Sequence, residues 1–207
     1  MTDRLVERTL RDFSDDLASE RPVPGGGSAA AYAGALGAAL CAMVLRLAAK
    51  KSEQPLAERI GELDGLRGDF LRLVDDDSAA FARVSEAMKM PRATAEEKAR
   101  RKERVQSGLL AAARVPLEVA KTARRLLEAC ERAMGDAPAM AVSDIGVGAL
   151  MAGTALRGAA LNVMINLASL DDPGQVKALS EELDRALEGS DEQSARVVEF
   201  VESRIAR

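Results

Sequence analysis

The chain has 207 residues, an aromatic content of 2% and a formal net charge of −4. This length supports one large domain with a buried core, and the charge argues against nucleic-acid binding, which normally needs a strong basic excess. Histidine is absent and the two cysteines are isolated, which argues against a zinc site and leaves proton transfer to other side chains.

Alanine, leucine, arginine and glutamate dominate the composition, and this favours helices over sheets. The N-terminal sequence MTDRLVERTLRDF is charged and amphipathic, which predicts no secretory signal peptide and a cytoplasmic protein. Cys41 and Cys130 each lie in an apolar stretch, so we expect both to be buried and reduced.

The first predicted element is an amphipathic helix over residues 4–17, with Leu5, Thr9, Phe13 and Leu17 on one face. Two prolines and three glycines then interrupt the chain. Ser28 is the expected N-cap of a second helix, rich in alanine and glycine, that reaches about residue 50.

The third predicted helix covers residues 55–90 and carries one stripe in which spacings of four and three alternate. Eight of the ten residues on this stripe are apolar, and the exceptions are Arg67 and Asp77. The stripe predicts one packing face, made of Leu56, Ile60, Leu63, Arg67, Phe70, Val74, Asp77, Phe81, Val84 and Met88.

A fourth helix is expected after Pro91, because Thr94 and Glu97 have the spacing of a capping box. It runs to about residues 134–135 and includes Pro116, where a kink is expected.

Ser143 or Asp144 is the expected N-cap of a second small-residue helix, and Asp172 is expected to cap a helix that starts at Pro173. The sequence of residues 175–205 predicts one long helix, or two helices with a break at residues 189–190. We therefore expect an all-α fold: residues 1–207 form one domain, a bundle of long antiparallel helices with the two small-residue helices at its centre.

The uncharged stretch RPVPGGGSAAAYAGALGAALCAMV admits several interpretations. A membrane span is disfavoured, because alanine and glycine contribute little transfer energy. A phosphate-binding loop is disfavoured, because PGGGS has no lysine and follows no strand. Small residues give both helices smooth surfaces that permit close backbone approach or leave room for a flat ligand, and the glycine turn exposes N–H groups that favour a polar ligand.

Asp77 is the main candidate for chemistry. Its place on the apolar stripe predicts a buried carboxyl group with a raised pKa, which suits acid–base catalysis without histidine. The structural alternative is a buried salt bridge to Arg67 or Arg157.

Asn162 and Asn166 share a face of the second small-residue helix, where they either satisfy each other or contact the edge of a heterocycle. Arg157 lies on a different stripe and suits a subunit contact or an anionic group. Lys50 and Lys51 end the first small-residue helix, where cations complement the helix dipole.

The ordered segments LASERPVPGGGSAAAYAGALGAAL, KK, DDSAAF, SDIGVGAL and LRGAALNVMIN are similar to those of the cyclodeaminase/cyclohydrolase family, over nearly the whole chain. The resemblance implies an all-helical homodimer with a tetrahydrofolate site near the glycine turn. It also implies an enzyme that closes 5-formimidoyltetrahydrofolate to 5,10-methenyltetrahydrofolate with loss of ammonia, or hydrolyses the methenyl compound to 10-formyltetrahydrofolate. Tetrahydrofolate is then the substrate, and no metal or further cofactor is expected.

This resemblance suggests roles for individual residues. Asp77 would shuttle the proton, Lys51 and Asp144 would polarise or orient the substrate, and Asn162 and Asn166 would contact the pterin. The remaining substrate-binding candidates are the backbone of Gly25, Gly26, Gly27 and Ser28, together with Arg157.

The sequence departs from the family pattern at two places. Around the lysine pair, Ala49 stands where a glycine is usual and Ser52-Glu53 follow where a tyrosine is usual. APAMAV replaces an asparagine-containing stretch before Ser143. These departures keep open a second class of function, a non-catalytic helical dimer that binds folate or a protein. The sequence alone does not choose between the two folate reactions.

Overall fold

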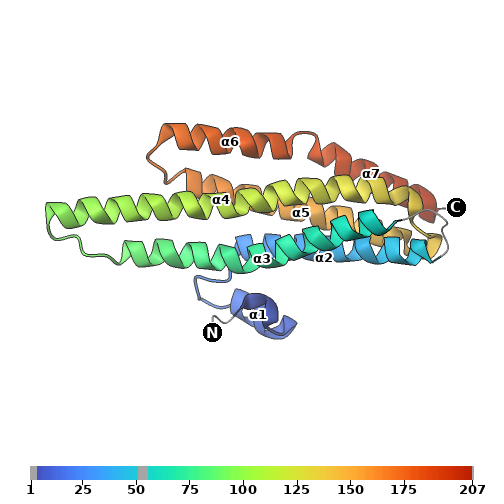
Figure 1. Cartoon of the computed structure of the whole chain (residues 1–207), viewed down its shortest axis with the longest axis horizontal. Coiled ribbons are helices and arrows are strands. Elements are labelled where there is room, and N and C mark those ends of the chain that lie inside the picture. Colours follow the sequence, from blue (N-terminus) through green and yellow to red (C-terminus); the bar gives the residue numbers. More distant parts are fainter. Residues whose placement is uncertain (1–3, 51–55, 207) are drawn as a thin grey trace.

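The computed structural model describes residues 4–50 and 56–206, and every regular element in these ranges is helical (Figure 1). The prediction of an all-α fold is therefore confirmed. The α-helices are α1 (Leu10–Leu17), α2 (Gly26–Ala49), α3 (Ala57–Met88), α4 (Ala95–Ala133), α5 (Val142–Leu167), α6 (Pro173–Leu187) and α7 (Ser190–Ile205). Short 3-10 helices lie at Leu5–Glu7, Met134–Asp136 and Ala139–Ala141.

Four long helices form the core. Helix α2 packs on α3, α3 on α4, α4 on α5 and α5 back on α2, and successive helices run in opposite directions (Figure 1). Helices α6 and α7 pack on α4 and α5. This arrangement confirms the predicted bundle of antiparallel helices, because short connections between long helices leave neighbours antiparallel.

The two small-residue helices meet at a close contact between their backbones. A Cβ atom added at Gly37 would lie 2.9 Å from the carbonyl oxygen of Gly148, and one added at Gly148 would lie 2.6 Å from the Cys41 sulfur. The prediction of close backbone approach is confirmed. Side chains larger than hydrogen at these positions would push α2 and α5 apart.

Gly34 has a different role, because it makes room for an aromatic ring. A Cβ atom there would lie 2.4 Å from Cε1 of Phe70, which is 0% exposed. We expect Gly34→Ala to lower the free energy of unfolding by about 1–3 kcal/mol, since the buried ring has no free space to enter. In contrast, Gly61 of α3 has no neighbouring atom within 4 Å of its added Cβ.

Gly61→Ala is the matched control, and it should stabilise the protein by about 0.5–1 kcal/mol because alanine has the higher helix propensity. Urea unfolding followed by circular dichroism measures both effects. Equal stability of the two variants would contradict the packing role of Gly34.

The predicted helix over residues 4–17 is wrong in its first half. A 3-10 turn ends at Glu7, and α1 begins after Thr9, whose hydroxyl accepts a hydrogen bond from the backbone of Asp12 (3.1 Å). The N–H of Leu5 instead donates to Asp75 on α3 (2.8 Å). Tertiary hydrogen bonding to α3 therefore replaces a continuous helix.

The predicted caps of α4 and α6 are confirmed. Thr94 and Glu97 form the capping box, and α4 continues through Pro116 without a break. Asp172 caps α6. Gly189 separates α6 from α7 with a φ of 64°, a conformation that favours glycine, so residues 175–205 form two helices.

Two predicted N-caps are wrong. Gly25 caps α2, and Ser28 lies inside its first turn. Ala141 precedes α5, so Ser143 and Asp144 are both helical residues. In each case the helix starts earlier than the first side chain able to cap it, because the preceding residues already pack against the bundle.

The stripe on α3 is largely buried up to Val74, except at Arg67, whose side chain is 47% exposed near Asp64. This exposure corrects the predicted place of Arg67 in the packing face. Phe70 and Val74 are buried, whereas Phe81 and Met88 are 44% and 51% exposed, which corrects their predicted place in the packing face. Helix α2 starts at Gly26, beside Asp77, so the last three turns of α3 extend past it. The missing neighbour leaves these side chains facing a cavity.

The cysteines and the apolar helices also have places in this core. Cys41 and Cys130 are fully buried and not bonded, with their sulfur atoms 3.0 Å apart. The contact with Cys41, followed by burial, raises the pKa of the Cys130 thiol and favours its neutral form.

Helix α2 and residues Ala139–Leu167 are long and apolar enough to cross a membrane. However, 61% and 50% of their most apolar 18-residue segments are buried inside the bundle.

Candidate active site

A cavity of about 350 Å³ lies where α2 begins. Its walls come from the segment before α2, from the exposed end of α3, from α4 and from the C-terminal half of α5. Six residues singled out from the sequence meet there: Gly25, Gly26, Gly27, Asp77, Asn162 and Asn166.

Asp77 is half-buried against the first turn of α2. A Cβ atom at Gly27 would lie 2.2 Å from Oδ1 of Asp77 and 2.8 Å from Oδ2, so only glycine permits this approach. The hydroxyl of Ser28 donates to Oδ2 (2.8 Å). The glycine turn and the carboxyl group therefore form one structural unit.

The environment of Asp77 alters its acidity. Burial raises the pKa of the Asp77 carboxyl above its ordinary value, and hydrogen bonds from the hydroxyl and the backbone amide of Ser28 oppose the rise. The positive end of the α2 dipole also favours the ionised form. Burial makes the protonated form of the carboxyl group easier to reach and the hydrogen bonds from Ser28 stabilise the ionised form, so both states that a proton shuttle needs are stabilised.

The predicted structural alternative, a salt bridge to Asp77, is not formed among the described residues. Arg67 lies near Asp64 (4.0 Å), and Arg157 pairs with Asp191. The neighbouring carboxylates also have other partners: Asp75 binds Arg4 (3.0 Å) and Asp76 binds Arg72 (2.6 Å). Asp77 thus faces the cavity with no ion pair to any of the residues that the structure describes.

The two asparagines hold the opposite wall. Nδ2 of Asn162 donates to the Gly158 carbonyl (2.9 Å), and Nδ2 of Asn166 donates to the carbonyls of Ala112 (3.1 Å) and Asn162 (2.8 Å). Within the described part of the chain, neither Oδ1 atom accepts a hydrogen bond. The amide nitrogens are therefore occupied by the protein, and the amide oxygens are available to a ligand.

The apolar lining was not predicted as part of the site. Phe81 and Met88 of α3 share the cavity with Leu109 of α4 and Ile165 of α5, which is 70% exposed. The stripe on α3 contained a signal for the first two, since it places them on the same face as Asp77. No sequence signal identified Ile165, because its contribution depends on how α5 is placed against α3.

Two predicted site residues lie away from this cavity. Arg157 binds Asp191, with Nε 3.1 Å from Oδ1, beside a different hollow between α5 and α7. Asp144 is in the first turn of α5, and the eighteen residues that separate it from Asn162 span about 27 Å of helix. Lys51 lies outside the described residues. Within one chain, therefore, Arg157 and Asp144 do not share a site with Asp77, which corrects their predicted grouping.

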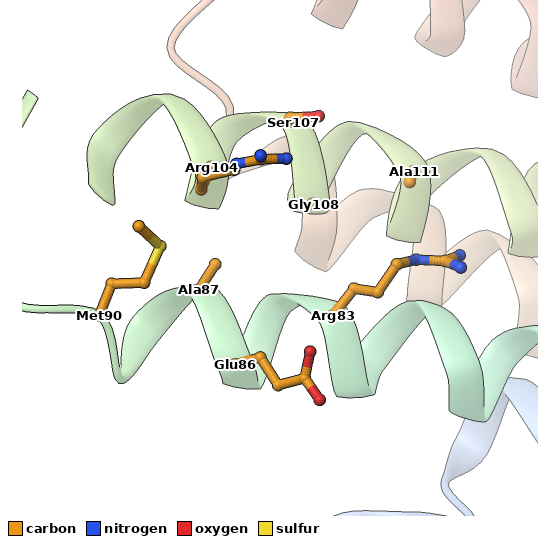
Figure 2. A pocket seen from close by; sticks show the side chains of 8 residues that line it. All are labelled: Arg83, Glu86, Ala87, Met90, Arg104, Ser107, Gly108 and Ala111. Carbon is orange, nitrogen blue, oxygen red and sulfur yellow. The ribbon is translucent and has the colours of Figure 1, made fainter. Parts of the chain in front are cut away.

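A larger cavity, of about 450 Å³, lies between the end of α3 and the start of α4 (Figure 2). Arg83 extends toward α4 near Ala111, and the Glu86 carboxylate points away from α4. None of the residues singled out from the sequence lines it. The cavity at the start of α2 is the better candidate, because a half-buried acid and polar groups converge there.

Comparison with known proteins agrees with this fold and shows the family. Residues 9–185 match the family model described as Formiminotransferase-cyclodeaminase. A methenyltetrahydrofolate cyclohydrolase from Methylorubrum extorquens is 37% identical over 202 residues, covering 95% of this chain and 97% of the relative. A formimidoyltransferase-cyclodeaminase from Gallus gallus is 35% identical over 98% of this chain, which spans only 38% of that longer protein.

Among solved structures, the crystal structure of formiminotetrahydrofolate cyclodeaminase from Thermotoga maritima superposes with a TM-score of 0.84 at 27% identity. The match covers 95% of this chain and 97% of the solved chain. Both the sequence matches and the structural match extend over most of this chain. The chain therefore belongs to the formiminotransferase-cyclodeaminase family.

Proposed function

We propose that the protein is an enzyme of one-carbon folate metabolism. It converts 5-formimidoyltetrahydrofolate to 5,10-methenyltetrahydrofolate and ammonia, or hydrolyses 5,10-methenyltetrahydrofolate to 10-formyltetrahydrofolate. The named activities of its relatives support this reaction class. The observation that carries the proposal is the half-buried carboxyl group of Asp77, which faces a cavity beside the glycine turn.

Both reactions pass through a tetrahedral carbon that bridges nitrogens 5 and 10 and carries either the departing amino group or a hydroxyl group. Each reaction needs one proton removed and one donated. Cyclodeamination removes a proton from nitrogen 10 as it attacks and supplies one to the departing ammonia. Hydrolysis removes a proton from water and supplies one to the nitrogen that leaves. Asp77 is the proposed shuttle for both, since burial raises the pKa of its carboxyl group and makes the protonated form easier to reach during turnover.

The cavity also offers means to orient a pterin. The oxygens of Asn162 and Asn166 can accept hydrogen bonds from the amino and N–H groups along the pterin edge. N–H groups at the start of α2, at Gly25–Gly27, can donate to its acceptors. Phe81, Met88 and Ile165 supply apolar surface against the rings.

The protein is also proposed to be a homodimer, supported by an unpartnered apolar surface. Val147, Leu150, Leu161, Met164 and Ile165 of α5 are 42–70% exposed, and they recur along one side of the helix. Ile165 also lines the cavity, so a second copy on this surface would cover the rim of the site. A contribution of Asp144 to the cavity would require that second copy, because Asp144 lies in the first turn of α5.

Leu161→Glu is expected to convert the dimer to a monomer, because a carboxylate would be buried in the interface. Light scattering after gel filtration measures the mass. Leu10→Glu is the matched control, since Leu10 is equally exposed (72%) but lies on α1, and it should leave the dimer intact. A dimeric Leu161→Glu variant would place the interface elsewhere.

We further propose that the protein is cytoplasmic and needs no metal and no cofactor beyond its folate substrate.

Ala49 and residues 137–142, where the sequence departs from the family pattern, lie at the end of the bundle opposite the cavity. The departures therefore leave the walls described here intact.

The activity test uses purified protein with each substrate. Loss of the near-ultraviolet absorbance of 5,10-methenyltetrahydrofolate reports hydrolysis, and its gain from the formimidoyl compound reports cyclodeamination. Turnover of only one compound assigns the reaction. Folate binding without either reaction would contradict the proposal and favour the non-catalytic alternative.

A further inference from the structure

Ser28 occupies an unusual position next to the proposed proton shuttle. Its side chain is fully buried, and within the described structure its Oγ lies within hydrogen-bond distance of three oxygen atoms. These are Oδ2 of Asp77 (2.8 Å), the carbonyl oxygen of Val74 (3.2 Å) and Oγ of Ser78 (3.3 Å). A serine hydroxyl has only one proton, so it cannot donate to all three at once.

The direction of these hydrogen bonds depends on the state of Asp77. An ionised carboxylate only accepts, so Ser28 must then donate to Oδ2. When Oδ2 carries a proton, Asp77 becomes the donor and Ser28 the acceptor. The hydroxyl proton of Ser28 can then turn to the Val74 carbonyl, which has a second lone pair besides the one used in the helix.

We propose that Ser28 is a positioning residue for the reaction, which holds Asp77 in one place in both protonation states by switching its hydroxyl proton between Asp77 and the Val74 carbonyl. The proton of Ser28 moves by rotation about the C–O bond, and no bond to it is broken. Without the Val74 carbonyl, protonation of Asp77 would leave the Ser28 hydroxyl proton only the longer contact with Oγ of Ser78 (3.3 Å). This inference rests on the proposed function for its use in turnover.

Among the residues that the structure describes, the charged groups nearest Asp77 in the chain are already paired with other side chains. On α3, Asp75 and Asp76 are bound by Arg4 and Arg72. On α2, the ring of Tyr32 packs against Phe13, with 5.5 Å between centroids. The facing residues of α4 and α5, Leu109, Ala112, Asn162 and Asn166, do not titrate, and Arg21 in the segment before α2 is bound to Asp16. Ser28 is therefore the described polar side chain whose hydrogen bond opposes the effect of burial on Asp77.

The test measures the pKa of Asp77 directly, by the ¹³C resonance of its carboxyl group in folate-free protein. The resonance is assigned by its loss in Asp77→Asn. Ser28→Ala should raise the pKa by about one unit, because a charge-assisted hydrogen bond to the ionised form is lost. The acidic limb of the kcat/KM profile should move to higher pH by the same amount.

Matched variants separate this role from simple packing. Ser28→Thr keeps a hydroxyl and should return the pKa to within about 0.3 units of the parent value, whereas Ser28→Cys, a weaker donor of similar size, should shift it upward. Ser78→Ala should leave it unchanged, since Ser78 makes no hydrogen bond to Asp77 in the described structure. Each variant is first checked by circular dichroism, and its pKa is compared with the parent value only when its spectrum matches that of the parent.

An unchanged pKa in both Ser28→Ala and Ser28→Cys would overturn the inference and leave Ser28 as a packing residue. The titration requires no turnover. A shifted pKa in a protein that converts neither folate compound would therefore refute the proposed function while the positioning role of Ser28 stands.

Discussion

Asp77→Asn is expected to lower kcat by about 10²–10⁴-fold, the usual contribution of a general acid or base. Asparagine keeps the size and polarity of the side chain but cannot exchange a proton. The dissociation constant for a folate should change by less than about threefold, because the walls formed by Gly25–Gly27 and the two asparagines remain. Turnover assays and fluorescence titration with a folate measure the two effects separately.

The same substitution should change stability in a way that depends on pH. The pKa of Asp77 is raised in the folded protein, so stability falls as pH rises from the unfolded pKa, about 4, to the folded value. Above that range the cost of a buried charge is fully present, and Asp77→Asn removes it. The variant should therefore have a higher Tm than the parent at pH 7, and the gain should vanish near pH 4.

Asp76→Asn serves as the control, since Asp76 is adjacent in sequence but binds Arg72 away from the cavity. It should retain parental kcat. Parental turnover by Asp77→Asn would remove Asp77 from the mechanism, and a Tm that falls at pH 7 would show that its carboxylate stabilises the fold.

Gly27→Ala is expected to lower kcat by about 10²-fold, the effect typical of a misplacement of about 1 Å in a catalytic group. The added Cβ would lie within 2.8 Å of both carboxyl oxygens and the carbon of Asp77, so the carboxyl group must move. Alanine is a good helix residue at the start of α2, so the fold should persist. Kinetics and circular dichroism together test this expectation.

Gly153→Ala is a suitable control for Gly27→Ala. Gly153 lies in the other small-residue helix, away from the cavity, and its added Cβ would meet only the Ser194 hydroxyl at 3.7 Å, an ordinary contact. This variant should keep parental kcat. A Gly27→Ala enzyme with full activity would show that the close contact between α2 and Asp77 has no part in catalysis.

Features that depend on neighbouring residues in the chain could be predicted from the sequence. The capping box of Thr94 and Glu97 and the cap at Asp172 are hydrogen bonds over two to four residues, so composition and spacing suffice to identify them. The stripe on α3 likewise placed Asp77 on the face that meets α2. An all-α bundle follows from such local patterns.

Predictions about how residues come together had mixed outcomes. Asn162 and Asp144 lie on the same helix, yet only Asn162 reaches the cavity with Asp77. Phe81 was expected in the core and instead lines the cavity, since α3 extends past the start of α2. Ser28 was expected to cap α2, but its hydroxyl bonds to α3.

The sequence by itself determined the helices, their approximate limits and the face of α3 that carries Asp77. Only the tertiary structure decided how far each helix slides along its neighbours, and hence which residues share a cavity. Periodicity fixes rotation about a helix axis but contains no information on axial position. That position is set by close contacts such as Gly37 on Gly148 and Gly27 on Asp77, between residues far apart in the chain.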